Sequence, residues 1–576
     1  MIVSVKNTFK EKILNDKFTL LFLAVILALG LFVRFEKYSE TSYWSDDMSA
    51  IPGGLYWFYP PYNFFPGLAT NAAPPLGHML IGAGCMLSGE DFSSVRDIKP
   101  VFYPGREELV GRQMALAENY CHFPMFLFGA LALFALMILA FTLLDRFAAL
   151  WVSSFYAFYP HLLELSRWVK EDIVLLFFVA LALYYLWKGL NADPGYSSEL
   201  FFFILASLFI GLAQATKWYA GMFFIFVGLV FIIKHWNSFK SVVYKVLSLA
   251  DKSFHRDPSQ HQRHFLIVGI LSIATFIFSV LAFFQFSVKT FFDTLKVYHQ
   301  FNQSISTASI SFSQLWRDVL FFLIHGNLID ILIFTASIIA IVWLIFKKQK
   351  SLPEKFLLSL VALFMISALL FGIAFELVRV FLAYGIGLVL IAGLVVGEQS
   401  IIWSFFKNKK LWFGLFLAVY IMFSFNIVHS SVPYFTSTNE IICGIAPDIC
   451  KQETAMNKYA SRKIAETLAP MLSENETYLP SNTEYFYLRQ GDSLHYYRFL
   501  QAFRQQFKRE PKINEVVQYF LPDGRHLRYI VMNPTGGGNF ADDKAAIREA
   551  YVPNNIIKLN NVEAAYIYDI ENLKKR

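Results

Sequence analysis

Long apolar runs separated by short polar connections dominate most of the chain. The first run, Phe18 to Val33, follows a lysine-rich N-terminal stretch without a small-residue cleavage site, so it is predicted to be a retained span rather than a signal peptide. Further apolar runs lie near residues 122–144, 147–164, 172–188, 200–215, 219–233, 265–285, 327–346, 355–375, 378–397 and 411–430. Several are shorter than the ~20 residues that cross a bilayer, so their ends are expected to extend into the connections. The pattern predicts about eleven transmembrane helices.

The pattern changes near residue 431. From there to residue 576 no apolar run is long enough to span a bilayer, and charged residues become frequent. Segments such as 484–488 and 527–532 predict strands, whereas 451–473 and 540–549 predict helices. We therefore expect an all-α polytopic membrane domain over residues 1–430, followed by a small α/β domain over 431–576.

Composition supports a membrane protein. The 576 residues are 56% hydrophobic and only 16% charged, whereas soluble domains carry about 25% charged residues. A soluble globular chain and a disordered chain are both excluded, and the long apolar runs exclude the short alternating segments of a β-barrel. The net charge of +7 is read as charge in the connections on one side of the membrane, so no nucleic-acid partner is expected.

The positions of Lys and Arg predict the orientation. If the N-terminus is cytoplasmic, the even-numbered connections are cytoplasmic too, and the basic residues gather there: Lys234, Lys240, Lys245, Lys252, Arg256 and Arg263, then Lys347, Lys348, Lys350 and Lys355, then Lys407, Lys409 and Lys410. With an odd number of spans, the segment after residue 430 lies outside. The first outer loop, at about 35–121, is long and rich in aromatic residues and prolines.

The four cysteines all fall on this outer side or at its membrane edge. Cys443 and Cys450 are near enough in sequence to close a short disulfide loop, which an oxidising compartment permits. Two free thiols are the alternative for that pair. Cys85 and Cys121 are the other two.

Ionisable residues at the ends of the predicted spans also collect on the outer side. They are Asp46 and Asp47 after the first span, Arg167 and Asp172 between the third and fourth, Lys217 between the fifth and sixth, and Glu376 with Arg379 at the start of the tenth. Taken singly, each could be a solvated helix-end anchor. Glu376 and Arg379 lie one helical turn apart and could pair, and the two aspartates could cap a helix at 47–58. Together they predict a site with two adjacent carboxylates and several cations.

Several of these residues lie in short motifs that follow one another in a fixed order. The motifs are Asp46-Asp47, then Pro74-Pro75-Leu76-Gly77-His78, then Ser166-Arg167 with Asp172 five residues later, and finally Lys217-Trp218-Tyr219-Ala220-Gly221. In this order they resemble the C-type glycosyltransferases (GT-C) that use polyprenyl-phosphate sugars, most closely the protein O-mannosyltransferases. The family usually has Glu at the position of Asp47 and Lys at that of His78. The C-terminal outer domain resembles prokaryotic relatives and the aminoarabinose transferases.

The resemblance implies transfer of a sugar, mannose in the nearest branch, from a polyprenyl- or dolichyl-phosphate donor to an acceptor hydroxyl. It implies a GT-C membrane fold and favours Asp46 over Asp47 as the base. A dianionic leaving group at the membrane edge needs fixed cations, so Arg167 and Lys217 are the leading phosphate partners, with Arg379 and His78 next. Asp172 and Glu376 are assigned supporting roles, Asp172 by holding Arg167 or a span end. Single displacement would invert the anomeric configuration.

The acceptor, a protein or a lipid or glycan, stays open at this point. The sequence shows no nucleotide or haem motif, names no metal ligand, and leaves a divalent metal at the acid pair undecided. A transporter or lipid flippase is the alternative from another class, although its charges would gather near the midplane within internal repeats. An anchored assembly protein is a further alternative, for which this many spans are excessive.

Overall fold

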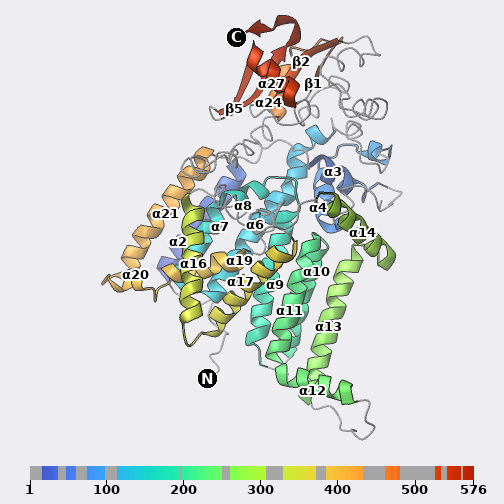
Figure 1. The fold of residues 1–576 in the computed structure, drawn as a ribbon. Helices are drawn as coiled ribbons and strands as arrows, with labels where there is room; N and C mark the ends of the chain where they lie inside the picture. The colour runs from blue at the N-terminus through green and yellow to red at the C-terminus, as the bar shows by residue number, and fades with distance from the viewer. Residues whose placement is uncertain are drawn as a thin grey trace.

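The computed structural model describes residues 16–36, 47–59, 74–97, 113–193, 197–248, 260–305, 328–371, 385–431, 461–473, 475–479, 526–532, 541–559 and 562–576. Within these ranges the chain is mostly helical (Figure 1). The helices are α2 (Lys17–Glu36), α3 (Asp47–Leu55), α4 (Pro75–Met86), α6 (Glu118–Leu143), α7 (Arg146–Phe158), α8 (Pro160–Leu165), α9 (Asp172–Asn191), α10 (Ser197–Gln214), α11 (Gly221–Lys234), α12 (Trp236–Ser248), α13 (Gln260–Ala282), α14 (Val288–Ile305), α16 (Leu328–Phe346), α17 (Leu352–Phe371), α19 (Ile386–Gly393), α20 (Ile401–Ser404), α21 (Lys409–Ser431), α24 (Ser461–Leu468) and α27 (Ala541–Ala550).

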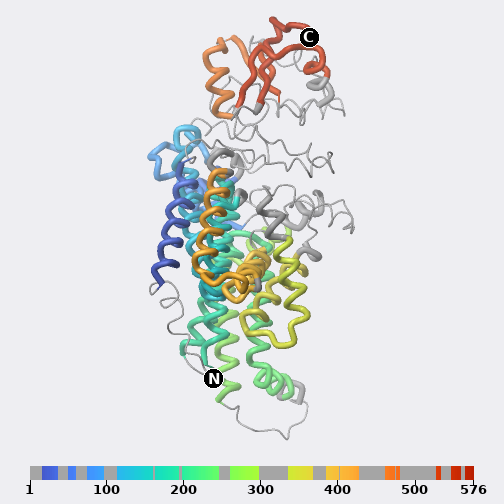
Figure 2. Tube along the Cα trace, turned by 90° about the vertical axis from the view of Figure 1, so that its left-hand side faces the viewer, coloured from blue at the N-terminus to red at the C-terminus, as the bar shows by residue number. Residues whose placement is uncertain are grey.

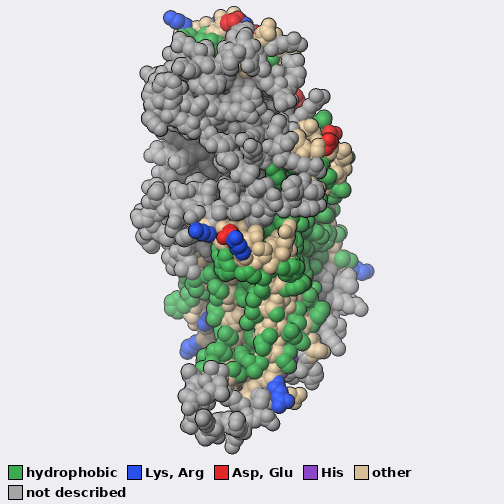
Figure 3. Space-filling view, turned by 90° about the vertical axis from the view of Figure 1, so that its right-hand side faces the viewer, with side chains coloured by type: hydrophobic (Ala, Val, Ile, Leu, Met, Phe, Trp, Pro, Cys, Tyr) green, Lys and Arg blue, Asp and Glu red, His purple; other side chains and the backbone are tan. Residues whose placement is uncertain are grey.

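The chain is an integral membrane protein. In the described ranges five helices are long and apolar enough to cross a bilayer, namely α2, α6, α9, α10 and α13. The bent pair Trp218–Lys234 and Trp236–Tyr244, with an angle of 90° between its halves, would make a sixth. Figure 3 shows a broad area of hydrophobic side chains on one face of the molecule, and α13 alone exposes Ile267, Ile270 and Phe278. The predicted total of about eleven spans stays a prediction.

One predicted span is broken in two. The apolar run at 147–164 was expected to be a single helix, but α7 ends at Phe158 and α8 begins at Pro160. Proline has no backbone N–H and its ring clashes with the preceding turn, so it starts a helix more readily than it continues one. The expectation of a single helix is therefore wrong here. The short helix α8 follows the break, and Arg167 lies in the connection between α8 and α9.

A sharp corner joins α13 to α14. Phe286 N–H donates to the Leu281 carbonyl at 2.8 Å, and Gln285 N–H donates to the Ala282 carbonyl, which closes α13 with a Schellman motif. Gln285 (φ 52°) and Phe286 (φ 56°) both lie in the left-handed region, where glycine is the usual residue. The Ser287 hydroxyl then accepts a hydrogen bond from Thr290 N–H and caps α14. The sequence pattern predicted no helix after this corner.

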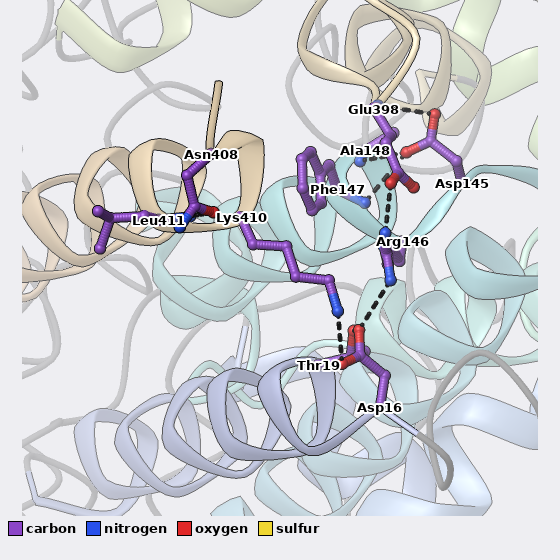
Figure 4. Close-up of polar contacts among 10 residues, drawn as sticks. All are labelled: Asp16, Thr19, Asp145, Arg146, Phe147, Ala148, Glu398, Asn408, Lys410 and Leu411. Carbon is purple, nitrogen blue, oxygen red and sulfur yellow. Dashed lines mark hydrogen bonds and ion pairs between the residues drawn. The ribbon is translucent and has the colours of Figure 1, made fainter. Parts of the chain in front are cut away.

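At one end of the bundle, ion pairs connect helices from distant parts of the chain (Figure 4). Arg146, the first residue of α7, pairs with Asp16 before α2 and with Glu398 before α20. Lys410 of α21 also pairs with Asp16, at 3.2 Å. Asp145 caps α7 by accepting from Phe147 and Ala148 N–H, and its second oxygen accepts from Glu398 N–H. The network connects α2 and α21 to α7.

A mixed sheet lies beyond the other end of the bundle, here called the sheet end (Figure 1 and Figure 2). Its strand order is β1-β2-β5-β4, with β1 parallel to β2 and the other pairs antiparallel. The strands are β1 (Glu476–Leu479), β2 (His526–Met532), β4 (Asn555–Leu559) and β5 (Val562–Asp569), beside a short pair of β3 (Tyr551–Val552) and β6 (Lys574–Lys575). The predicted strand at 527–532 and helix at 540–549 are confirmed as β2 and α27, whereas 484–488 lies outside the described residues.

Helix α24 connects this C-terminal part to the bundle. The Arg462 guanidinium pairs with Glu118 at the start of α6, whose side chain is 6% exposed. Ile464, Ala465 and Leu468 are buried and belong to the same apolar core as the membrane helices. The C-terminal part therefore rests on α6 through both charge and apolar packing.

A disulfide joins Cys85 at the end of α4 to Cys121 at the start of α6. Both side chains are fully buried. The predicted Cys443–Cys450 bridge lies outside the described residues. The observed bridge ties the short helix α4, which does not span the membrane, to a long one.

Replacing both cysteines, Cys85→Ala with Cys121→Ala, is expected to lower the thermal midpoint of the detergent-solubilised protein by several degrees. The bridge closes a segment with a sequence separation of 36, and closure of such a loop contributes about 4 kcal/mol in the chain-entropy description. Differential scanning fluorimetry with and without reductant measures the effect. Reductant should lower the midpoint of the wild type and leave the double variant unchanged; equal midpoints for the two unreduced proteins would contradict the expectation.

Candidate functional site

Four of the predicted site residues lie in the described ranges with their side chains: His78, Arg167, Asp172 and Lys217. Asp47 is the first residue of α3 and is described for its backbone alone, which confirms a helix beginning there. Asp46, Glu376 and Arg379 lie outside the described residues. The structure places the four described residues near the ends of helices at the sheet end.

Helix α4 packs closely against the start of α9 because Gly77 in its first turn has no side chain. A Cβ on Gly77 would lie 2.2 Å from the Glu171 Cβ, so only glycine allows this approach. The preceding residues set the direction: Pro75 starts the helix, and Leu76 N–H donates to the Ala215 carbonyl at 2.9 Å. The first turn of α4 is thereby held between the start of α9 and the end of α10.

Lys217 lies between two carboxylates at the start of α9. Its Nζ is 2.8 Å from Glu171 Oε1 and 3.7 Å from Asp172 Oδ2. The Tyr219 hydroxyl donates to Asp172 Oδ1 at 2.9 Å. In the described part of the chain, the contacts of Asp172 run to Tyr219 and Lys217 and not to Arg167, one of the two roles that we expected for it, the other being to hold a span end. Asp172 instead fixes the segment that carries Lys217.

Glu171 is a residue that the sequence reasoning missed. Its side chain is 4% exposed and makes the shorter of the two contacts with Lys217. The signal available in the sequence was its position beside Asp172 at the start of an apolar run. Glu171, Asp172, Lys217, Tyr219 and His78 are hereafter called the α9 cluster.

The cations near Glu171 keep its carboxyl ionised. Burial raises the pKa of Glu171, but the charge and hydrogen bond of Lys217 and the charge of Lys170 outweigh it, so the pKa of this carboxyl lies well below its ordinary value. Burial is also the main cause that lowers the pKa of His78, opposed by Glu171. His78 is therefore neutral at neutral pH, and it can offer a hydrogen bond but not a fixed positive charge.

Two buried arginines donate hydrogen bonds to backbone carbonyls near the ends of α2 and α7. Arg34, in the last turn of α2, donates to the Gly30, Ala157 and Tyr156 carbonyls at 2.8, 2.9 and 3.1 Å. Arg167 Nη2 donates to the Val33 carbonyl. The last carbonyls of a helix have no partner within the helix, and a guanidinium both bonds them and suits the negative end of the helix dipole.

Arg34 was not singled out from the sequence, because an arginine at the end of an apolar run resembles an ordinary membrane-edge anchor. Its side chain is fully buried, and it connects α2 to the end of α7. The Arg167 side chain is 2% exposed and donates to the Val33 carbonyl near the end of α2. Part of the cation group that was predicted to face a phosphate therefore also has a structural task.

Helices α3 and α4 cross at two glycines. A Cβ on Gly82 would lie 2.3 Å from the Gly54 carbonyl carbon, and one on Gly54 would lie 2.1 Å from the His78 carbonyl oxygen. Backbones this close leave no room for a side chain. The helix that begins at Asp47 is therefore fixed against the helix that carries His78. In the described ranges, no group of three or more His, Cys, Asp or Glu side chains is placed to hold a metal ion.

The comparison with protein families adds a similarity to this geometry. Residues 24–292 match the family described as dolichyl-phosphate-mannose-protein mannosyltransferase. The match confirms the resemblance seen in the motifs, and the matched segment includes the whole α9 cluster and the acid pair Asp46-Asp47.

Solved structures similar to the chain include three membrane enzymes. The S. cerevisiae protein O-mannosyltransferase Pmt1-Pmt2 complex, bound to the sugar donor, is 19% identical, with a TM-score of 0.30, over 48% of this chain and 34% of that one. ArnT from Cupriavidus metallidurans, bound to undecaprenyl phosphate, is 14% identical, with a TM-score of 0.45, over 94% and 97%. The Archaeoglobus fulgidus oligosaccharyltransferase, tethered to an acceptor peptide, is 13% identical, with a TM-score of 0.45, over 95% and 74%.

The coverage of the yeast enzyme is partial. The chain spans about a third of the yeast chain that it matches, 34%. No curated protein sequence matches this chain.

Proposed function

We propose that the chain is a membrane glycosyltransferase that moves a sugar, mannose, from a polyprenyl- or dolichyl-phosphate donor to an acceptor hydroxyl, that of a protein Ser or Thr. The observation that carries this proposal is the family match over residues 24–292. That segment contains the acid pair and the α9 cluster, the two groups that the chemistry needs.

The reaction requires a base for the acceptor hydroxyl and positive charge that stabilises the departing phosphate. The acceptor oxygen attacks the anomeric carbon from the face opposite the phosphate, its proton passes to Asp46, and the bond between the anomeric carbon and the phosphate oxygen breaks with its electrons on the phosphate. Asp47 orients the acceptor or the base. One displacement of this kind inverts the anomeric configuration.

Lys217 is the leading phosphate partner in this proposal. Its ammonium has three donors, so it can keep Glu171 at 2.8 Å and still donate to a phosphate oxygen. Arg167 and Arg379 are further cations for the phosphate, and neutral His78 can donate a hydrogen bond to it. Asp172 with Tyr219 keeps the lysine segment in place, and Glu376 keeps its supporting role as a proposal.

The orientation follows from where the lysines lie. Helix α12, whose sequence includes Lys240, lies at the end of the bundle opposite the sheet end (Figure 1), and positive loops favour the cytosolic side. We therefore infer that the sheet end, the α9 cluster and the segment 431–576 face away from the cytosol, either outside the cell or in the lumen. The division into a membrane domain at 1–430 and an outer domain at 431–576 belongs to the same proposal.

The decisive experiment is a transfer assay on the purified chain in lipid nanodiscs. Radiolabelled polyprenyl-phosphate mannose is offered with a Ser/Thr-rich peptide, and polyprenyl-phosphate glucose and aminoarabinose with peptide and lipid acceptors serve as parallel arms. We expect labelled peptide from the mannose donor alone. Transfer to lipid from another donor would replace mannose and the protein acceptor while keeping the chemistry. Absence of transfer in every arm, with lipid phosphate crossing the bilayer instead, would favour a flippase and end the proposal.

A further inference from the structure

Helix α14 follows the strained corner at the end of α13. It carries Lys289, Asp293, Lys296 and His299 among its residues, so it is too polar to cross a bilayer. Its two neighbouring phenylalanines differ in environment: Phe292 is 59% exposed, whereas Phe291 is partly buried against an apolar cluster. The helix therefore has an inner side and an outer side.

The inner side of α14 rests on Trp218. The Phe291 ring meets the Trp218 ring edge-on, with centroids 5.4 Å apart. Phe284, the last buried residue before the corner, lies 5.7 Å from Trp218 and 5.4 Å from Phe291. The rings of Trp218, Phe284 and Phe291 are thus in mutual contact, and this cluster is hereafter called the aromatic seat.

Trp218 and Lys217 are neighbours in one short segment but contact different elements. Lys217 has an extended backbone (φ −148°, ψ 135°). Trp218–Ala220 then form one 3₁₀ turn. Lys217 and Tyr219 reach Glu171 and Asp172, whereas Trp218 reaches Phe284 and Phe291. The segment that carries Lys217 is thus held by α9 through its polar side chains and by α14 through Trp218.

The corner holds α14 in this place at a conformational cost. Two consecutive side-chain-bearing residues with positive φ, Gln285 and Phe286, occupy a sparsely populated backbone region. Such residues persist where surrounding contacts determine them. The hydrogen bond from Phe286 N–H to Leu281 and the aromatic seat are those contacts.

We propose that α14, seated on Trp218 through Phe291, positions Lys217 for the phosphate of the lipid-linked donor. The inference rests on the proposed function, because it assigns a task within that reaction. Phe291 and Trp218 are positioning residues: they act through Lys217 and leave the acid pair untouched. Loss of the seat should weaken donor use more than turnover.

The test compares two leucine substitutions on the same helix. Phe291→Leu keeps apolar bulk but removes the ring that meets Trp218, whereas Phe292→Leu makes the same change on the exposed side. We expect Phe291→Leu to raise the donor KM about threefold to tenfold, with kcat within twofold, because aromatic pairs of this kind couple by that much. Phe292→Leu should match the wild type, and Phe291→Tyr, which keeps the ring, should restore the donor KM.

Two readouts separate this inference from the proposed function. Equal donor KM values for Phe291→Leu and Phe292→Leu, in a wild type that transfers sugar, overturn the role of α14 and leave the function standing. If the wild type transfers no sugar, the function falls, and native mass spectrometry of bound undecaprenyl phosphate then decides the inference: weaker retention by Phe291→Leu alone supports it, and equal retention or no retention by the wild type overturns it.

Discussion

Lys217→Met is expected to abolish donor binding and also to destabilise the protein, whereas Lys217→Met combined with Glu171→Gln should recover stability without recovering activity. The single substitution leaves Glu171, 4% exposed, without the ammonium at 2.8 Å. Breaking one partner of a buried pair costs about 3–5 kcal/mol, because the remaining charge stays buried. The double substitution removes both charges and so removes that penalty.

The measurements are the thermal midpoint in detergent and the transfer rate at saturating acceptor. Recovery of transfer in the double variant would show that Lys217 serves the fold alone and not the donor. Lys217→Arg keeps the charge, so it should retain part of the donor binding. An unchanged apparent donor affinity in Lys217→Met, measured on folded protein, would remove this lysine from the phosphate site.

The same pair has a defined pH dependence. The pKa of Glu171 lies below its ordinary 4.5 in the folded chain, so the stabilisation from its ionised form is fully present above pH 4.5 and is lost as the pH falls towards the lowered value. The double variant lacks this carboxyl. Its thermal midpoint should therefore fall less than that of the wild type on acidification below pH 4.5.

The second large effect is expected at the acid pair. Asp46→Asn should reduce the transfer rate by about 10²- to 10⁴-fold, the usual contribution of a general base, while binding of undecaprenyl phosphate stays at the wild-type level. Asparagine keeps the size of the side chain and removes its basicity, so turnover should fall and donor binding should not.

Asp47→Asn is the matched control for Asp46→Asn. Because Asp47 orients the acceptor or the base, Asp47→Asn should lower the transfer rate less than Asp46→Asn does. A large loss from Asp47→Asn with near-normal turnover in Asp46→Asn would move the base to Asp47. Near-normal turnover in both variants would take proton transfer away from the pair altogether.

The sequence predicted those features that depend on local pattern. Apolar length predicted the helices that became α2, α6, α9, α10 and α13. Charges at run ends predicted a group of ionisable residues on one side of the membrane, and in the structure Asp172 of this group lies 3.7 Å from Lys217. The break at Pro160 was missed because composition stays apolar across it, and α12 and α14 were missed because their charged faces resemble loops.

The partners of the site residues could not be predicted, because they are made by tertiary packing. Nothing in the spacing of Glu171 and Lys217 shows that their side chains meet, since the contact depends on the turn after α10. The disulfide illustrates the same limit: four cysteines allow three pairings, and nothing in the spacing of Cys85 and Cys121 shows that they meet, because helix packing brings them together. This bridge is compatible with the predicted Cys443–Cys450 pair, which stays a prediction.

The glycines of α4 limit how this part of the protein can change over evolution. At Gly77 and Gly82 the neighbouring atoms lie where a methyl group would stand, so even the smallest side chain would clash at these positions, whatever its chemistry. Substitutions that reshape this part of the protein are therefore expected at the residues around these two glycines and not at the glycines themselves.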